Sequence, residues 1–212
     1  MDLSFESRVY HLTGLTPLLG SQPASQTIRQ TYLQSKAKQL TPEKRAEEDE
    51  IFSYDVEDTD TKVFPRDSKK DDRLCLMAHH IKGFFKESLN FLQPQAGIAL
   101  PAKKVDGLLF VEPGFIPIMR EGKEFYEEDS ILERPLIAQT MRGPRTALQS
   151  SEQIDDPWEL TFELTLLPNN GTAKSKPLTW DAIELAFQYG AFHGLGQWRN
   201  AAYGKFNYRR VD

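Results

Sequence analysis

The most constraining feature of this sequence is the segment from Trp158 to Leu166, in which apolar and polar residues alternate strictly. Successive side chains of a β-strand point to opposite faces of a sheet, so the alternation predicts a strand with one buried and one polar face. The buried face would carry Trp158, Leu160, Phe162, Leu164 and Leu166. The polar face would carry Glu159, Thr161, Glu163 and Thr165. Residues 168–171, Pro-Asn-Asn-Gly, then predict a turn.

Two segments have the pattern of helices. Apolar residues recur at helical spacing from Leu74 to Leu92, and Pro94 ends this run. Thr179 is predicted to cap a second helix that continues to Gly190, with Asp181 in its first turn, where a carboxylate is favourable.

Four more segments favour strands, and two segments favour loops. The strand candidates are residues 5–12, 107–111, 115–119 and 203–211. The acidic segment 121–133 is predicted to be an exposed loop, and the mostly polar segment 21–72 an insertion or loop arm. Within that insertion, residues 27–40 can form a helix and residues 44–50 are acidic and predicted to be mobile.

The order of these elements predicts the fold class. Strand, insertion, helix, two or more strands, the alternating strand, helix and strand follow one another in a single domain over residues 1–212. This order favours an α+β fold of the ferredoxin-like, or RRM-like, kind: an antiparallel sheet with helices on one face and a large insertion after the first strand.

Composition bounds the compartment and the partners. No apolar run has the roughly 20 residues that a membrane helix needs. The first residues lack a basic region followed by an apolar stretch, so we expect no secretory signal. One cysteine, Cys75, excludes an internal disulfide, so we expect a cytoplasmic protein. The net charge of −5 is segregated: residues 61–104 are basic overall, whereas residues 43–60 and 105–160 are acidic. Local fields therefore matter more than the total, although solvated surface charge without a partner explains the pattern equally well.

The segment from Gly190 to Phe206 combines glycines, cations and rings. Gly194, Gly196 and Gly204 would let the backbone approach a ligand and present N–H groups to an anion. The cations are Arg199 and Lys205, and the rings on which bases could stack are Trp198, Tyr203 and Phe206. The alternative is a helix C-cap and a connecting turn with the rings in the core.

Three segments, in order, resemble the CRISPR-associated RAMP superfamily, whose members form the backbone of guide-RNA effector complexes. The first resembles the family's first strand, the second its first helix, and the third its C-terminal glycine-rich loop and final strand. They are residues 9–20 (VYHLTGLTPLLG), 80–89 (HIKGFFKESL) and 194–206 (GLGQWRNAAYGKF). Residues 77–80, Met-Ala-His-His, depart from the family's usual proline-glycine-serine approach to the helix, and Ala202 replaces a usual glycine. The resemblance implies an RRM-like fold and RNA contact.

Two basic clusters are further candidates for phosphate contact. Arg142 and Arg145 flank a Gly-Pro pair, which predicts a stiff loop suited to bidentate contact, or else a surface turn whose arginines pair with segment 121–133. Lys82 and Lys86 are four residues apart and share one helix face, which could follow a nucleic-acid backbone or simply be solvated.

The histidines do not form a recognisable catalytic group. His79 and His80 are adjacent and would point to different faces of a helix. His80 or His193 could serve as the general base of a metal-independent endoribonuclease, but no Ser/His/Asp or Cys/His grouping accompanies them. We therefore predict no catalytic residues, no metal site and no cofactor.

Three functions follow from these observations. The first is a nucleic-acid-binding subunit of a CRISPR-type or related ribonucleoprotein assembly, with RNA favoured over DNA and other proteins as possible partners. The second is a phage or prophage accessory protein that contacts a defence complex through its acidic segments 43–60 and 121–133. The third is the endoribonuclease. The predicted nucleic-acid-binding residues are Lys82, Lys86, Arg142, Arg145, Gly194, Gly196, Trp198, Arg199, Tyr203, Gly204 and Lys205.

Overall fold

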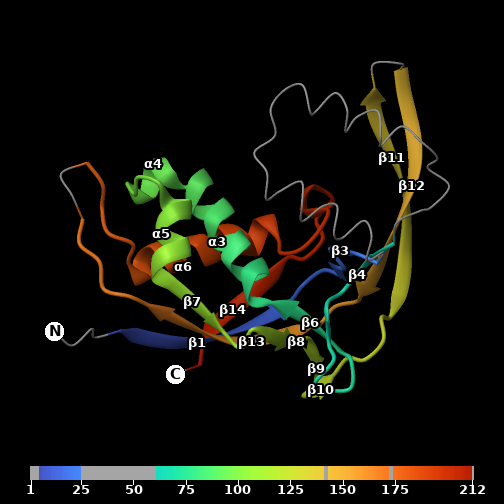
Figure 1. Ribbon diagram of the computed structural model, residues 1–212, viewed down its shortest axis with the longest axis horizontal. Helices are drawn as coiled ribbons and strands as arrows, with labels where there is room; N and C mark the ends of the chain where they lie inside the picture. The colour runs from blue at the N-terminus through green and yellow to red at the C-terminus, as the bar shows by residue number, and fades with distance from the viewer. Residues whose placement is uncertain (1–4, 25–60, 141–142, 172–173, 212) are drawn as a thin grey trace.

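The central sheet has the strand order of a split βαβ fold. The computed structural model describes residues 5–24, 61–140, 143–171 and 174–211. In it, β14 (Phe206–Arg210), β1 (Glu6–Gly14), β13 (Glu159–Leu166) and β7 (Leu109–Glu112) lie side by side and antiparallel (Figure 1). In chain order these are the fourth, first, third and second strands of the ferredoxin-like arrangement. The predicted fold class is confirmed.

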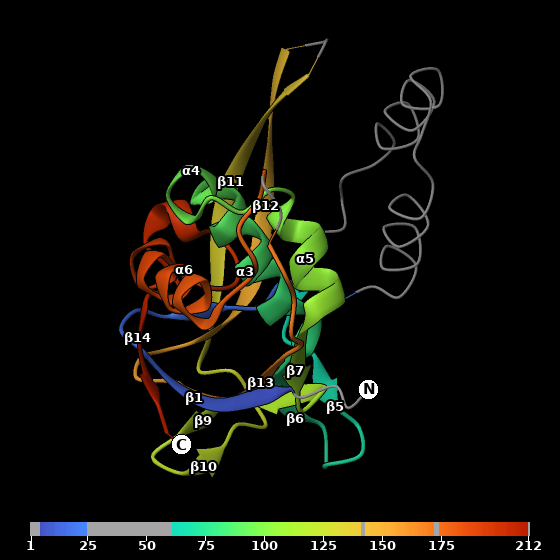
Figure 2. The same ribbon diagram turned by 90° about the vertical axis from the view of Figure 1, so that its left-hand side faces the viewer.

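Two helices cover one face of this sheet. They are α3 (Ala78–Phe91) and α6 (Trp180–His193) (Figures 1 and 2). The ring centroid of Phe187 in α6 lies 4.7 Å from that of Tyr10 and 4.8 Å from that of Tyr208. The five apolar residues of the alternating segment are all buried, as their pattern predicts. The cap of α6 is also confirmed, because the Ala182 amide donates to the Thr179 side chain at 3.4 Å.

The segment preceding α3 corrects one prediction. Residues 74–77 belong to β6 (Arg73–Met77), which pairs with β5 (Arg66–Asp67) and β8 (Phe115–Pro117), and not to the helix. Helical spacing through Leu74 and Met77 is coincidental, since Leu74, Cys75 and Leu76 are all buried. A strand covered on both faces has a continuous apolar run instead of an alternation.

The helices and strands near the middle of the chain also differ from the prediction. The helix α5 (Pro101–Leu108) was not predicted, and it includes the start of the predicted strand 107–111. A short helix, α4 (Gln93–Ala96), begins where Pro94 was expected to end helical structure, because proline is tolerated in the first turn. The predicted strand 115–119 is divided between β8 and β9 (Met119–Arg120), and β9 pairs with β10 (Lys123–Glu124).

A long two-stranded ribbon projects from the body of the protein (Figures 1 and 2). It consists of β11 (Ser130–Thr140) and β12 (Gly143–Ile154), and at its base β12 pairs with β2 (Leu18–Leu19) and β4 (Lys62–Val63). The predicted loop 121–133 is therefore partly wrong, because it contains β10 and the start of β11. Charged residues are tolerated there because β11 is an edge strand.

The described ends of the predicted insertion 21–72, residues 21–24 and 61–72, contain strands of these sheets. Besides β4 and β5, they contain β3 (Gln22–Pro23), which pairs with β4. The predicted helix 27–40 and the acidic residues 44–50 lie outside the described residues. Of the helices in the described part of the chain, none is long and apolar enough to cross a membrane.

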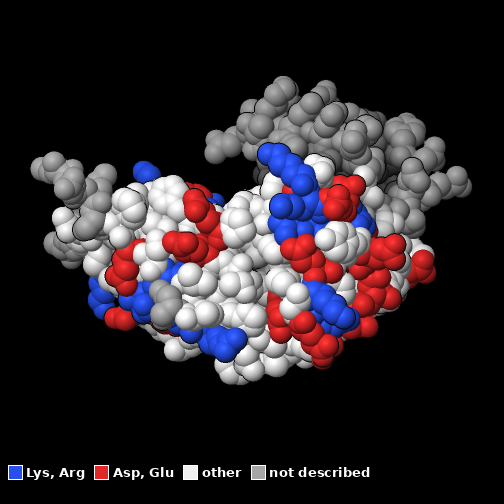
Figure 3. Space-filling model, turned by 90° about the horizontal axis from the view of Figure 1, so that it is seen from below, with Lys and Arg blue, Asp and Glu red and all other residues white. Residues whose placement is uncertain are grey.

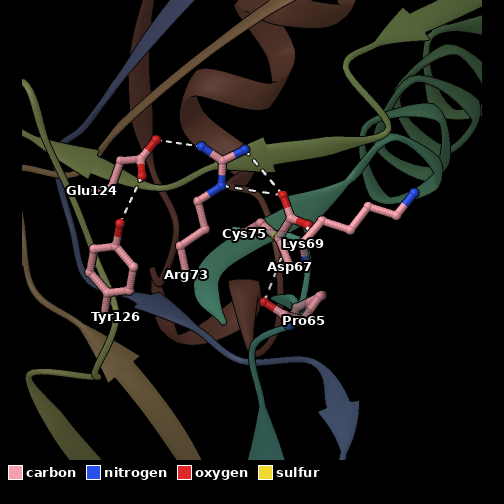
Figure 4. A network of polar contacts seen from close by, with 7 residues as sticks. All are labelled: Pro65, Asp67, Lys69, Arg73, Cys75, Glu124 and Tyr126. Atoms are coloured by element: carbon pink, nitrogen blue, oxygen red, sulfur yellow. Dashed lines mark hydrogen bonds and ion pairs between the residues drawn. The ribbon is translucent and has the colours of Figure 1, made fainter. Parts of the chain in front are cut away.

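A network of polar contacts joins β5, β6 and β10 (Figure 4). Arg73 donates to Asp67 Oδ2 through Nη2 at 3.1 Å and forms a second ion pair with Glu124. Cys75 is fully buried beside them, and its thiol donates to the Pro65 carbonyl at 3.2 Å. Burial is the main cause that raises the pKa of this thiol to about 11, so Cys75 is a structural residue here and not a nucleophile.

Candidate nucleic-acid interface

The C-terminal loop, defined here as residues 194–205, packs against the segment that follows β1. The Gly204 amide donates to the Pro17 carbonyl at 2.8 Å, and the Lys205 amide donates to Thr16 Oγ1 at 2.8 Å. The Leu15 amide in turn donates to the Lys205 carbonyl at 2.8 Å. Two of the three family-like segments are therefore in direct contact, although almost the whole chain separates them in sequence.

The glycines of this loop are required by its own packing. Gly204 has a φ of 70°, and a Cβ there would lie 1.9 Å from the Leu195 carbonyl oxygen. Gly194 has a φ of 91°, and a Cβ there would lie 2.3 Å from the Tyr203 carbonyl oxygen. Gly196 also has a positive φ and lies against Leu18 of β2. These contacts explain the glycines without a ligand, so phosphate binding by the bare backbone stays a prediction.

Two rings of the loop form an accessible stack. Trp198 and Tyr203 lie with their ring centroids 5.2 Å apart and an interplanar angle of 17°. Trp198 is 39% exposed and Tyr203 is half-buried, so a base could reach this pair. Phe206, which was also predicted to offer a ring, is fully buried in the core beneath α3, so that prediction was wrong.

Arg134 of the ribbon completes the stack, and it was not among the predicted site residues. Its guanidinium carbon lies 4.4 Å from the centroid of the Trp198 ring, a cation–π arrangement. Only 7% of the residue is exposed, and burial lowers the pKa of its guanidinium. Within the described part of the chain Arg134 forms no ion pair, which is rare for a charge so deeply buried.

Arg199 is positioned differently, because a carboxylate of α3 already holds it. Its Nη1 lies 2.6 Å from Glu87 Oε2, and His193 Nε2 lies 3.2 Å from Glu87 Oε1. Partial burial alone would raise the pKa of Glu87, but the hydrogen bonds from Arg199 and His193 hold it below its usual value. A phosphate would have to compete with Glu87 for Arg199.

The remaining predicted residues do not gather at the loop. Lys82 Nζ donates to the Asp106 carbonyl at 3.2 Å, and Lys86 forms an ion pair with the Asp106 carboxylate, so both lysines contact α5. Arg142 lies outside the described residues, and Arg145 is described only through its backbone, which pairs with Ala138 in the ribbon. Gly143 and Pro144 begin β12 and do not form the expected turn.

The face of the central sheet opposite the helices is not basic. Its side chains include Glu112, Glu159 and Glu163 beside Arg209, and His11 Nδ1 lies 3.0 Å from Thr161 Oγ1. Figure 3 shows this side of the molecule, where the coloured acidic and basic side chains are interspersed and form no continuous basic surface.

His80 lies at the first turn of α3 with its Nδ1 already engaged. The Met77 amide donates to this nitrogen at 3.3 Å, and burial, aided by the neighbouring His79, lowers the pKa of His80 to about 4. A base that is occupied and hard to protonate is a poor proton acceptor for catalysis. Among the described residues, no group of three or more His, Cys, Asp or Glu side chains could hold a metal ion.

The pKa of His80 predicts a loss of stability in acid. The unfolded histidine has a pKa near 6.5, so from pH 7 to pH 5 the unfolded state takes up a proton that the folded state with a pKa of about 4 does not. The free energy of unfolding should fall by about 2 kcal/mol over this range because of His80. Urea unfolding at both pH values measures the fall. It should be smaller in His80→Gln, which keeps an acceptor for the Met77 amide, and an equal fall in both proteins would contradict the assignment.

Comparison with known proteins gives matches among solved structures. No protein-family model and no curated protein matches the sequence. A chain in the cryo-EM structure of the Type III-B Cmr-beta bound to cognate target RNA aligns with a TM-score of 0.50 and 12% sequence identity. The two chains share a fold. The alignment covers 98% of this chain and 60% of the Cmr-beta chain, so this chain spans about three fifths of that length.

Proposed function

We propose that this protein binds single-stranded RNA through its C-terminal loop, as a subunit of a ribonucleoprotein assembly of the CRISPR type. The observation that carries the proposal is the exposed Trp198–Tyr203 stack beside Arg134, a buried cation without a carboxylate partner among the described residues. Proteins that bind single strands combine stacking rings with cations that attract the phosphates.

The position and the rings of this site favour single-stranded over double-stranded RNA. The loop lies where the base of the ribbon meets the ferredoxin-like body, since Ser151 of β12 donates to Gln197 at 3.2 Å. Aromatic rings can accept only unstacked bases, which a single strand provides and an intact duplex does not. The predicted cation Lys205 belongs to the same loop and would contact a neighbouring phosphate, whereas Arg199 would first have to leave Glu87.

Fold likeness supports the proposed setting. The Cmr-beta structure that contains the similar chain is bound to target RNA. A subunit that acts in such an assembly needs protein partners as well as RNA, and the projecting ribbon β11–β12 offers a surface for both. The RAMP-like assignment of the three sequence segments points in the same direction.

Fluorescence anisotropy with a labelled 12-nucleotide RNA tests the proposal. We expect binding at 50 mM salt, weaker binding to the same sequence as a duplex, and an affinity that falls as salt rises. Single-stranded DNA of the same sequence shows whether the sugar matters. Absence of binding to either single strand at low salt would overturn the proposal.

The same assay separates this function from that of an acidic accessory protein. Reversing the charges of Glu47, Glu48, Asp49 and Glu50 should leave RNA affinity unchanged or increase it, because four negative charges are replaced by four positive ones. If these carboxylates instead engage a basic partner, their reversal abolishes that contact. Intact labelled RNA after long incubation without metal would argue against the endoribonuclease alternative.

A further inference from the structure

The side chain of Gln197 is held in one orientation by two donors. Arg134 Nη2 lies 3.4 Å from Gln197 Oε1, and Ser151 Oγ lies 3.2 Å from the same atom. Arg134 has no acceptor atom, so only the carbonyl oxygen of the amide can face it. The amide nitrogen of Gln197 must therefore point away from these two residues, with both of its N–H groups fixed in direction.

The donors of this cluster lack acceptors. In the described structure Gln197 Nε2 has no hydrogen-bond partner. This nitrogen is not buried, so solvent reaches it. Arg134 Nε is buried and has no partner. Among the described residues, the guanidinium of Arg134 donates a single hydrogen bond, to Gln197. An arginine has five N–H donors, and leaving a buried charged donor unsatisfied is costly.

The missing element is an acceptor with negative charge. A neutral carbonyl would satisfy one or two N–H groups but would leave the guanidinium charge uncompensated, whereas a phosphate oxygen satisfies both needs. The adjacent rings then favour a phosphodiester over a carboxylate. A phosphodiester carries a base within reach of the Trp198–Tyr203 stack, which a carboxylate of a peptide does not.

We propose that Arg134 and Gln197 form a binding site for one phosphodiester group, whose neighbouring base stacks on the Trp198–Tyr203 pair. This inference rests on the proposed function and deepens it, because it assigns phosphate recognition to a residue of the ribbon and not to the glycines of the loop. Ser151 is a positioning residue, since its hydroxyl acts on the ligand only through the orientation of Gln197.

Gln197→Glu distinguishes a phosphate site from a purely structural contact. A carboxylate at this position would pair with buried Arg134, so the variant should melt at a higher temperature than the wild type. The same carboxylate would repel a phosphate, so RNA affinity should fall about 10-fold at 50 mM salt. Gln95→Glu, an exposed change on α4 with the same net charge, is the control and should leave the RNA affinity within about 2-fold.

Arg134→Gln tests the cation directly. We expect about a 10-fold loss of RNA affinity, and a slope of log affinity against log salt that is smaller by about 0.7, as for one lost phosphate contact on a single strand. The loss should persist on an RNA of abasic nucleotides, on which Trp198→Ala should have no effect because no base remains to stack. Thermal unfolding shows that each variant is folded.

Each result has one meaning. If the wild type binds RNA but Arg134→Gln changes neither affinity nor salt slope, the phosphate site is wrong and the proposed function stands. If Gln197→Glu raises the melting temperature and leaves RNA affinity unchanged, the contact is structural and the inference is again wrong. If the wild type binds no single strand, the proposed function itself fails.

Discussion

Replacing Gly204 by alanine is expected to dismantle the C-terminal loop and abolish RNA binding. The new Cβ would lie 1.9 Å from the carbonyl oxygen of Leu195 and 2.9 Å from its nitrogen, which are backbone atoms that no rotamer change can move away. A φ of 70° adds about 1 kcal/mol of strain for any residue with a Cβ. Together these effects should lower the free energy of unfolding by about 3 kcal/mol or more, which urea titration measures.

Gly122→Ala is the matched control for this change. Gly122 has a nearly identical φ of 75°, but nothing lies within 4 Å of the Cβ that alanine would add. This variant should lose only the strain of about 1 kcal/mol and bind RNA like the wild type. If both alanine variants lost the same stability, the requirement for glycine at position 204 would come from backbone strain and not from the close approach of Leu195.

The second large effect is expected from Trp198→Ala, which removes the ring that links Arg134 to Tyr203. Base stacking contributes about 1–3 kcal/mol per base, so RNA affinity should fall between about 5-fold and 150-fold. Because Trp198 is 39% exposed, stability should change far less than affinity. Trp198→Phe, which retains a smaller ring, should give an intermediate affinity in the same anisotropy titration.

Phe192→Ala is the control for loss of an exposed ring. Phe192 lies on α6 and is 81% exposed, and no ring contact is found for it in the described structure. Its removal should leave RNA affinity unchanged. Equal losses in both variants would show that binding follows general surface apolarity, and the stack at the C-terminal loop would then have no specific role.

Much of the fold could be predicted because its signals are local. The alternation from Trp158 to Leu166 is a direct consequence of strand geometry, and Thr179 caps α6 through a hydrogen bond three residues away. The prediction was wrong at Leu74–Met77, where a strand buried on both faces has the same apolar residues as a helix. Only its pairing with neighbouring β5 and with β8, which is distant in sequence, distinguishes the two.

The ribbon was missed for a related reason. Pro135 and Pro144 interrupt any strand pattern, since proline has no N–H to donate to a neighbouring strand. Both are compatible with β11 and β12 because a two-stranded ribbon has free edges over most of its length. No periodicity in residues 130–154 could have shown that Arg134 faces the C-terminal loop.

By itself, the sequence determined the ferredoxin-like order of strands and helices, and it marked the C-terminal loop as a concentration of glycines, rings and cations. The tertiary structure decided which of those groups are usable: it buried Phe206, paired Arg199 with Glu87 and brought Arg134 against Trp198. The physical reason is the sequence distance over which each interaction acts. Periodicity and capping act over a few residues, whereas desolvation and charge pairing depend on neighbours that only the folded chain brings together.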